Sequence, residues 1–190
     1  PRSTLFPYTT LFRSPENFTQ DGLNALLTET WYVRFFGNVR LEVYIGLSYL
    51  TNGNNFTYIS NQEYQILNQW GTTYNRRYHG VALDDIFQKT DCLKSNSTRF
   101  YFKAVDGYRS FDCTISIVMN NPSQFLLAHM EQGEILKTKE EGGEGPIKGV
   151  APLSLLQNDA EIIQIYADNG QNTVYNSQYF VKYVNQICII

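Results

Sequence analysis

Short segments in which apolar and polar residues alternate recur along this chain, and they constrain its fold more than any other feature. Between 39 and 47, Val, Leu, Val, Ile and Leu occupy every second position, as in a strand that buries one face. Residues 108–117 alternate in the same way and follow the β-prone segment 99–105 across the turn signal Asp106-Gly107, so a hairpin is predicted. Further strands are predicted at 31–36, 125–130, 161–166 and 179–190.

Helical signals are fewer and stand singly between the predicted strands. Residues 21–27 carry leucine pairs at near-helical spacing, and residues 60–70 begin with Ser-Asn-Gln-Glu, which has the form of a capping box. A loop is expected at 71–77, followed by a helix over 78–87 whose apolar residues share one face. These elements predict an α+β fold, a mixed and strand-dominated single domain.

Composition excludes several classes of protein. Apolar residues make up 43% of the 190 positions and charged residues 17%, so the chain has material for a buried core. A net charge of −3 without a run of Lys or Arg argues against nucleic acid as a partner. No apolar stretch approaches the ~18 residues of a membrane span. Two histidines and three cysteines, in spacings that match no zinc pattern, predict no metal site.

The first fourteen residues differ from the rest of the chain. Residues 1–14 contain Leu-Phe twice, no acidic residue and neither a helical nor a strand period. Their sequence is similar to the translation of a common sequencing adapter, so we expect them to be non-native and take the domain as 15–190. Without Arg2 and Arg13 the domain has 13 basic residues against 18 acidic ones, a net charge of −5.

Four segments in series resemble motifs of one family. Residues 78–87 resemble Trp-x-Gly-Val-x-Leu-x-x-Leu-Leu, and residues 104–108 match Ala-x-Asp-Gly-Tyr. Residues 127–148 resemble Leu-Ala-x-x-x-Asn-Gly-x-x-Leu followed by Gly-Gly-Pro-Leu-Arg, and residues 179–187 resemble Trp-Val-Lys-x-Val-x-x-Ile. The family is the oxidoreductase molybdopterin-binding domain, with the fold of the sulfite oxidase catalytic domain. The resemblance extends over 39–190 and implies that fold, a molybdopterin cofactor and redox chemistry at molybdenum.

The departures from this family concern its catalytic centre. In the family's enzymes a cysteine upstream of the Gly-Val-x-Leu element ligates molybdenum, and no cysteine occurs here between 15 and 91. A thiolate is the soft donor that such a metal takes from the protein. Cys113 and Cys188 are expected to be buried structural residues, whereas Cys92 could be exposed. The resemblance therefore assigns no catalytic or metal-ligating residue and indicates a catalytically degenerate domain.

Further departures fall on residues that would contact a cofactor. Lys148 stands where the family has arginine, which replaces a forked guanidinium by a point charge. Glu144 is inserted in the same motif, and Tyr78 replaces the family's tryptophan.

Several residues are suited to bind a small anion or a pterin. His79 and Gly80 are expected at the start of a helix, where backbone amides could meet an anion, with two arginines adjacent. The alternative for this segment is a loop imidazole with two solvated arginines. Tyr108 would lie at the mouth of the predicted hairpin, where a structural turn is the alternative. The predicted cofactor-binding residues are Arg76, Arg77, Tyr78, His79, Gly80, Tyr108 and Lys148.

Other polar residues are interpreted as structural. His129 lies in the predicted strand 125–130 and is expected to be a hydrogen-bonded sheet residue rather than a ligand. Glu140, Glu141 and Glu144 lack the fixed oxygen geometry of a calcium loop, so a solvated loop is expected over 137–146.

Two functional hypotheses follow. The chain is a molybdopterin-binding-fold oxidoreductase domain that retains a pterin or small-anion site, or it is a cofactor-free binding or structural module of an extracellular or envelope protein. Sequons at Asn17, Asn55 and Asn96 favour an extracellular location. Elemental analysis for molybdenum would separate the two hypotheses, and for actual activity the cofactor-free module is preferred.

Overall fold

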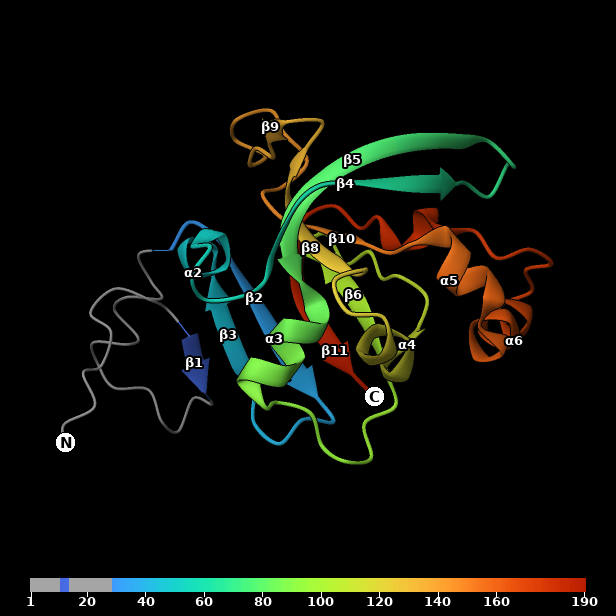
Figure 1. Ribbon diagram of the computed structural model, residues 1–190, viewed down its shortest axis with the longest axis horizontal. Helices are drawn as coiled ribbons and strands as arrows, with labels where there is room; N and C mark the ends of the chain where they lie inside the picture. Colours follow the sequence, from blue (N-terminus) through green and yellow to red (C-terminus); the bar gives the residue numbers. More distant parts are fainter. Residues whose placement is uncertain (1–10, 14–28) are drawn as a thin grey trace.

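Two β-sheets pack around a shared hydrophobic core in the computed structural model, with helices beside them (Figure 1). The structure describes residues 29–190 and the backbone of 11–13. The first sheet is mixed, because β11 runs parallel to β2 while its other pairs are antiparallel. In spatial order its strands are β1 (Leu11–Arg13), β3 (Val43–Gly46), β2 (Tyr32–Gly37), β11 (Val184–Ile189), β6 (Arg99–Ala104) and β7 (Cys113–Thr114).

The second sheet is antiparallel and contains the longest strands. Its β4 and β5 form a hairpin of ten residues a side that curves away from the body of the molecule as an arm (Figure 1). In spatial order its strands are β10 (Lys148–Val150), β8 (Leu126–Glu131), β5 (Thr73–Ala82) and β4 (Tyr58–Leu67), with β9 (Glu134–Ile135) paired to β8.

The helices are short and none within 29–190 is long and apolar enough to cross a bilayer. The longest helix is α6, and Asp159 is its N-cap. The Asp159 carboxylate accepts a hydrogen bond from the Ile162 amide at 2.9 Å. The helices are α2 (Leu47–Thr51), α3 (Leu83–Thr90), α4 (Ile115–Asn120), α5 (Leu153–Asn158), α6 (Ala160–Asp168) and the 3₁₀ turn η2 (Asn176–Tyr179).

One hydrophobic cluster joins both sheets and the helices. Phe35 of the first sheet meets Phe87 of α3 edge-on, with ring centroids 6.2 Å apart, and Phe87 in turn meets Phe100 at 5.7 Å. Val81 and Leu127 of the second sheet belong to the same cluster. Since both sheets share this core, the described residues form the single α+β domain that the sequence predicts.

A smaller cluster lies on the second sheet where the arm leaves the body. It contains Tyr64, Tyr78 and Leu126, with Phe180 packed against them. The rings of Tyr78 and Phe180 have centroids 5.6 Å apart, and those of Tyr64 and Phe180 are 6.2 Å apart. This aromatic cluster supports the site described below.

Three predicted strands are confirmed by the structure. The segments 31–36, 99–105 and 125–130 match β2, β6 and β8 within one residue at each end. A turn at Gln132 and Gly133, both with positive φ, joins β8 to β9. The predicted helix at 21–27 lies outside the described residues.

The expectations for 60–70 and 71–77 are wrong, because these segments form the β4–β5 arm. The capping-box residues Ser60 and Glu63 lie on a strand, and the left-handed Asn61 between them coincides with a shift in the β4–β5 register. Tyr64 and Ile66 are buried while Glu63 is exposed, which is strand periodicity. Pairing along the whole hairpin therefore outweighs the local capping signal.

The start of the helix predicted at 78–87 is also wrong. Residues 78–82 complete β5, and α3 begins only at Leu83. Pairing of Val81 with both Tyr58 and Leu127 places this segment in the middle of a sheet. His79 and Gly80 are therefore strand residues rather than helix-start residues.

Four predicted strands are shorter than expected or absent. The segment 161–166 is part of helix α6, since Ile162, Ile165 and Tyr166 share a buried helical face. In 108–117 the pairing with β6 is limited to β7 and an isolated bridge between Arg109 and Lys103, and helix α4 then begins at Ile115, which is buried together with Val118. The strand predicted over 39–47 is confined to β3, and that predicted over 179–190 to β11.

Candidate functional site

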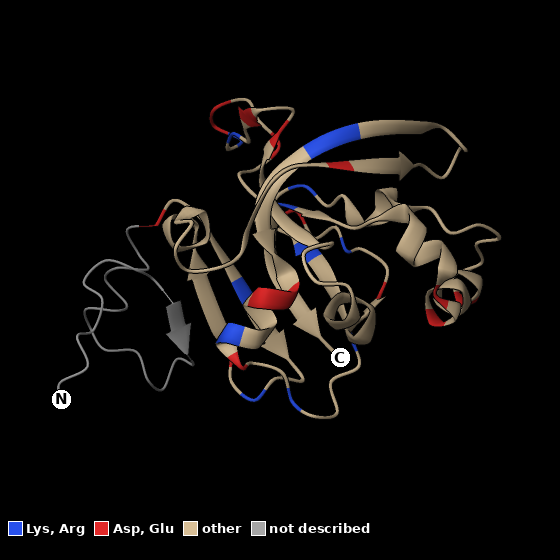
Figure 2. Cartoon of the chain, viewed as in Figure 1, with Lys and Arg blue, Asp and Glu red and all other residues tan. Residues whose placement is uncertain are grey.

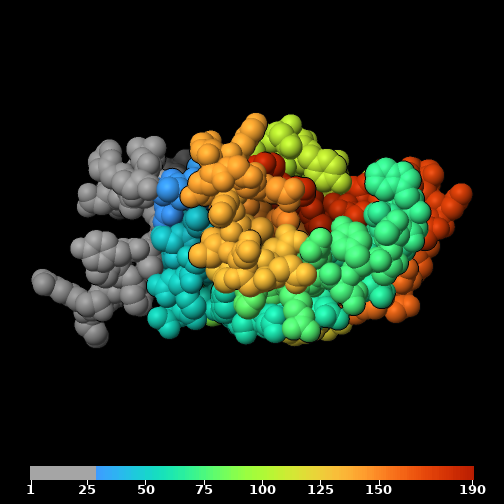
Figure 3. Space-filling view, turned by 90° about the horizontal axis from the view of Figure 1, so that it is seen from above, coloured from blue at the N-terminus to red at the C-terminus, as the bar shows by residue number. Residues whose placement is uncertain are grey.

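A hollow of about 480 Å³ opens between the β4–β5 arm, the end of β8 and the segment after η2. From above, the C-terminal part of the chain, in red, lies between the orange loop around 137–146 and the green arm (Figure 3). We call this cavity the Lys148 hollow. Its charged and aromatic lining residues are Tyr74, Arg76, Tyr78, Glu131, Glu144, Lys148, Phe180 and Lys182.

Lys148 is the buried charge at the centre of the hollow. It begins β10 opposite Ala128 of β8, and only 6% of its side chain is exposed. Its ammonium group forms an ion pair with Glu131 and lies 3.3 Å from Oε2 of Glu144. Because a buried charge is costly unless it is paired, the two carboxylates are what allow a lysine at this position.

Glu131 is held in place by three groups. The antiparallel register sets it opposite Tyr78, whose hydroxyl donates to Oε1 at 3.2 Å. Nε of Arg76 lies 3.7 Å from the same oxygen, and Lys148 pairs with the other one. Burial, with a smaller effect of Glu131, raises the pKa of Tyr78, so this hydroxyl stays protonated and acts as a donor.

Glu144 reaches the hollow from the other side. It forms ion pairs with Lys148 and with Lys182. Partial burial opposes its ionisation, but the hydrogen bonds and positive charges of Lys182 and Lys148 together outweigh burial and lower the pKa of Glu144. Three cations thus face two carboxylates, which leaves the Lys148 hollow with one net positive charge.

Aromatic rings form the walls around these charges. Tyr74 lies on the arm, with the Arg76 guanidinium 5.7 Å from its ring centroid, and Phe180 lies opposite against Tyr78. A cavity with a charged floor and aromatic walls is suited to a small ligand with an anionic group and a flat body.

The structure brings three predicted residues together here, namely Arg76, Tyr78 and Lys148. Arg77 follows Arg76 in a strand, so its side chain leaves on the opposite face. There its Nε lies 3.3 Å from the Glu63 carboxylate of β4, and Figure 2 shows the blue arginine stretch above the red glutamate. Arg77 therefore forms an ion pair across the β4–β5 hairpin and does not line the hollow.

His79 and Gly80 have local roles in the second sheet. Nδ1 of His79 accepts a hydrogen bond from the Asn61 amide at 3.3 Å. A Cβ on Gly80 would lie 2.3 Å from the carbonyl oxygen of Leu127, so glycine allows the strands to approach closely there. The helix N-terminus expected beside them lies elsewhere, since α3 begins at Leu83.

Tyr108 lines an adjoining hollow of about 290 Å³ that shares Phe180 and Lys182 with the Lys148 hollow. Its backbone amide donates to the Asp106 carboxylate at 3.0 Å, and Gly107 has φ +91°, so the expected turn forms. Its hydroxyl donates to the side-chain oxygen of Gln178. Tyr108 is thus near the site but belongs to its rim.

Sequence reasoning missed Glu131, Lys182 and Phe180 as site residues. Glu131 directly follows the predicted strand 125–130 and Lys182 lies in the closing motif, but neither position carries a local signal of its own. Glu144 was noticed as an insertion and interpreted as part of a solvated loop. The register of Tyr78 opposite Glu131 is what joins these charges into one site.

None of the three thiols lines the Lys148 hollow among the residues described. Cys92, which could have been exposed, is fully buried, as is Cys113, and burial raises the pKa of both thiols. Cys188 is half-buried on β11, paired with Tyr101 of β6. The hollow therefore offers ammonium, guanidinium and carboxylate groups but no thiolate, and its donor set does not fit molybdenum in the family's manner.

His129 lies in β8 as expected, but it is not fully hydrogen-bonded. Its Nε2 is buried without a hydrogen-bond partner within the described part of the chain, and its ring centroid lies 5.4 Å from that of Tyr58. Burial, with a smaller effect of His79, lowers the pKa of His129. Residues 29–190 contain no cluster of three or more His, Cys, Asp or Glu side chains that could hold a metal ion.

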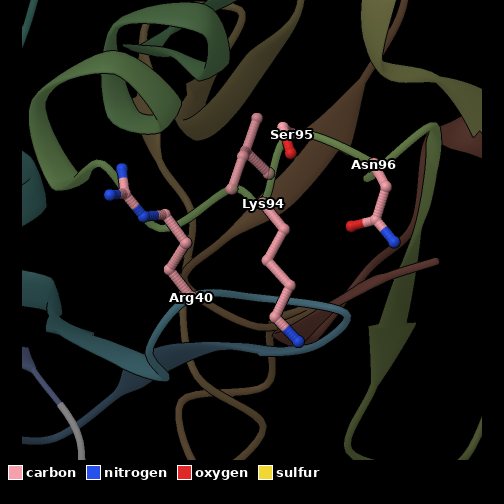
Figure 4. A pocket seen from close by; sticks show the side chains of 5 residues that line it. Arg40, Lys94, Ser95 and Asn96 are labelled. Atoms are coloured by element: carbon pink, nitrogen blue, oxygen red, sulfur yellow. The ribbon is translucent and has the colours of Figure 1, made fainter.

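A second charged hollow, of about 510 Å³, lies beside the turn that precedes β6. Figure 4 shows that the side chains of Arg40, Lys94 and Asn96 point in different directions instead of converging. Arg40 already forms an ion pair with Asp91, its Nη1 2.7 Å from Oδ2. The Lys148 hollow is therefore the better candidate site.

Comparison with known proteins supports the fold but names no family. No family model matches the chain, and no curated protein matches it. Among solved structures it is similar to the sulfane dehydrogenase SoxCD from Paracoccus pantotrophus, with 15% identity and a TM-score of 0.59 over 85% of this chain. The chain spans 38% of the length of that structure's chain. This likeness shows the fold, and it agrees with the fold of the sulfite oxidase type that the sequence motifs predict.

Proposed function

We propose that this domain binds a small anionic ligand in the Lys148 hollow and uses a sulfite-oxidase-like scaffold without a cysteine ligand for molybdenum. The observation that carries the proposal is the buried Lys148, which faces a cavity with two further cations and no thiol. On this proposal the domain is degenerate as a molybdenum enzyme and retains a binding site.

The chemistry of the hollow suggests what the ligand contains. Lys148, Lys182 and Arg76 supply charge-assisted donors for an oxyanion, whereas Tyr74 and Phe180 offer flat faces. A pterin carries both a flat ring and, in cofactor form, a phosphate. The proposal therefore includes a pterin that is bound through these side chains, with no protein sulfur on a metal.

The pairing of all three cations favours a second candidate. Arg76, Lys148 and Lys182 each already face a carboxylate, so this network could serve only to stabilise the fold of a cofactor-free structural module. Such a module would bind none of the anions that fit the hollow. The extracellular location favoured by the sequons remains part of this second candidate.

Metal content and ligand binding of the purified chain test the proposal. We expect no stoichiometric molybdenum or tungsten by elemental analysis, and saturable binding of sulfate, inorganic phosphate or pterin-6-carboxylate. Binding should weaken about tenfold or more in Lys148→Met and in Lys182→Met, because each variant loses a charge-assisted hydrogen bond. Lys182→Met is the less disruptive of the two for folding, since half of that side chain is exposed. Lys139→Met removes the same charge from an exposed loop position and should bind as the wild type does.

Two results would overturn the proposal. Stoichiometric molybdenum in the purified protein would show that the chain holds the metal without a thiolate in the hollow. A failure of all three anions to bind a folded wild-type chain would favour the structural module.

A further inference from the structure

The two carboxylates of the Lys148 hollow differ in how firmly they are held. Glu131 has 21% of its side chain exposed and contacts three partners, which are Lys148, Arg76 and Tyr78. Glu144 has 49% of its side chain exposed, although it covers a lysine that is only 6% exposed. A ligand that approaches from solvent therefore meets Glu144 before it can reach Lys148.

The backbone that carries Glu144 is anchored, so its side chain is the part that can move. The carbonyl oxygen of Glu144 accepts a hydrogen bond from the Tyr183 amide at 3.1 Å, and the Tyr183 hydroxyl donates to the Gly143 carbonyl at 2.8 Å. Gly145, at φ +87°, lies so close to Tyr183 that a Cβ there would be 2.6 Å from its ring. Side-chain rotation, rather than loop motion, would open the site.

We propose that Glu144 is an internal anion that occupies the ligand position between Lys148 and Lys182, and that it determines which anions this site accepts. The inference rests on the proposed function of the hollow. A bound ligand would place its oxyanion where the Glu144 carboxylate now lies, and Glu144 would rotate into solvent.

Charge balance then identifies the class of ligand. With Glu144 displaced, Arg76, Lys148 and Lys182 face Glu131 alone, which leaves two positive charges in the hollow. A dianionic group such as sulfate or a phosphate ester neutralises them. A simple carboxylate merely replaces one monoanion by another and gains nothing over the tethered Glu144. The site therefore selects tetrahedral dianions over monocarboxylates.

Glu144→Gln tests this inference in the full chain because it removes the charge and keeps the shape. Sulfate and acetate are titrated separately, and binding is followed by the NMR shifts of the Gly143, Gly145 and Lys148 amides. We expect wild type to prefer sulfate over acetate. Glu144→Gln should bind sulfate about five to ten times more tightly and acetate measurably, because a half-exposed ion pair no longer competes.

Glu140→Gln is the matched control, since it removes the same charge from an exposed position of the same loop. Glu144→Ala should act in the same direction as Glu144→Gln, and unchanged melting temperatures exclude a folding effect. If sulfate binds wild type but no more tightly to either Glu144 variant than to Glu140→Gln, the inference is wrong while the proposed function stands. If no anion binds the wild type or any variant, both are wrong.

Discussion

The core between the two sheets and the Lys148 hollow are built by neighbouring parts of the same fold, yet the core is apolar and the hollow is charged. The core contains Cys92 and Cys113 among packed aromatic and aliphatic side chains and admits no solvent to them. The hollow contains ammonium, guanidinium and carboxylate groups and no sulfur. The packing of this domain and the chemistry of its hollow thus depend on separate sets of residues.

The largest expected difference between the two regions is in stability. Phe35→Ala should lower the free energy of unfolding by about 4 kcal/mol, because it leaves a cavity beside Phe87 in the shared core. Phe180→Ala, at the half-buried wall of the hollow, should cost about 1–2 kcal/mol because its site is partly open to solvent. Urea unfolding followed by circular dichroism measures both values, and equal costs would contradict a division between core and hollow.

A smaller expected effect on stability distinguishes the buried Lys148 from the half-exposed Lys182 within the hollow. Lys148→Met should cost about 2–3 kcal/mol of unfolding free energy, because Glu131 loses the ion pair that compensates its burial. Lys182→Met should cost less than about 0.5 kcal/mol, since half of that side chain is exposed. The same urea unfolding experiment measures both values. An unchanged unfolding free energy in Lys148→Met would mean that the burial of Glu131 does not depend on this ion pair.

The smallest effect concerns pH. Burial lowers the pKa of His129 below its ordinary value of 6.5, so the unfolded chain binds a proton that the folded chain resists. Stability should therefore fall as the pH falls below about 6.5 towards the lower pKa of the folded state. His129→Leu should reduce this slope, and His79→Gln should reduce it less, because His79 is the smaller of the two causes of the lowered pKa of His129. Melting temperatures between pH 5 and pH 8 measure the slope, and an identical slope in His129→Leu would exclude this histidine as its source.

The fold was predictable where one face of a strand is buried and the other is not. The segments that became β2 and β6 show this contrast, because their buried residues alternate with more exposed ones. The arm could not be read in this way, because residues 73–77 are exposed on both faces and carry no alternation. Ile162, Ile165 and Tyr166 have helical spacing, yet a strand is predicted from the sequence over 161–166.

The candidate site was predictable only in part. Resemblance to a family indicated Tyr78 and Lys148, and proximity along the chain added Arg76. Their partners are set by strand register and by chain crossings, as in the contact of Lys148 with Glu131, 17 residues earlier. No local sequence pattern predicts such a contact, so Glu131 and Lys182 can be recognised as site residues only once the topology is known.

The position of β11 has a consequence for how the domain is made. This strand lies between β2 and β6, and the indole nitrogen of Trp31 donates to the carbonyl of Val184 across 153 positions of sequence. Because β2 and β6 both precede β11 in the sequence, the first sheet cannot complete its pairing until β11 is available. These contacts join residues far apart in the sequence, so we expect slow, cooperative folding of this sheet rather than stepwise growth.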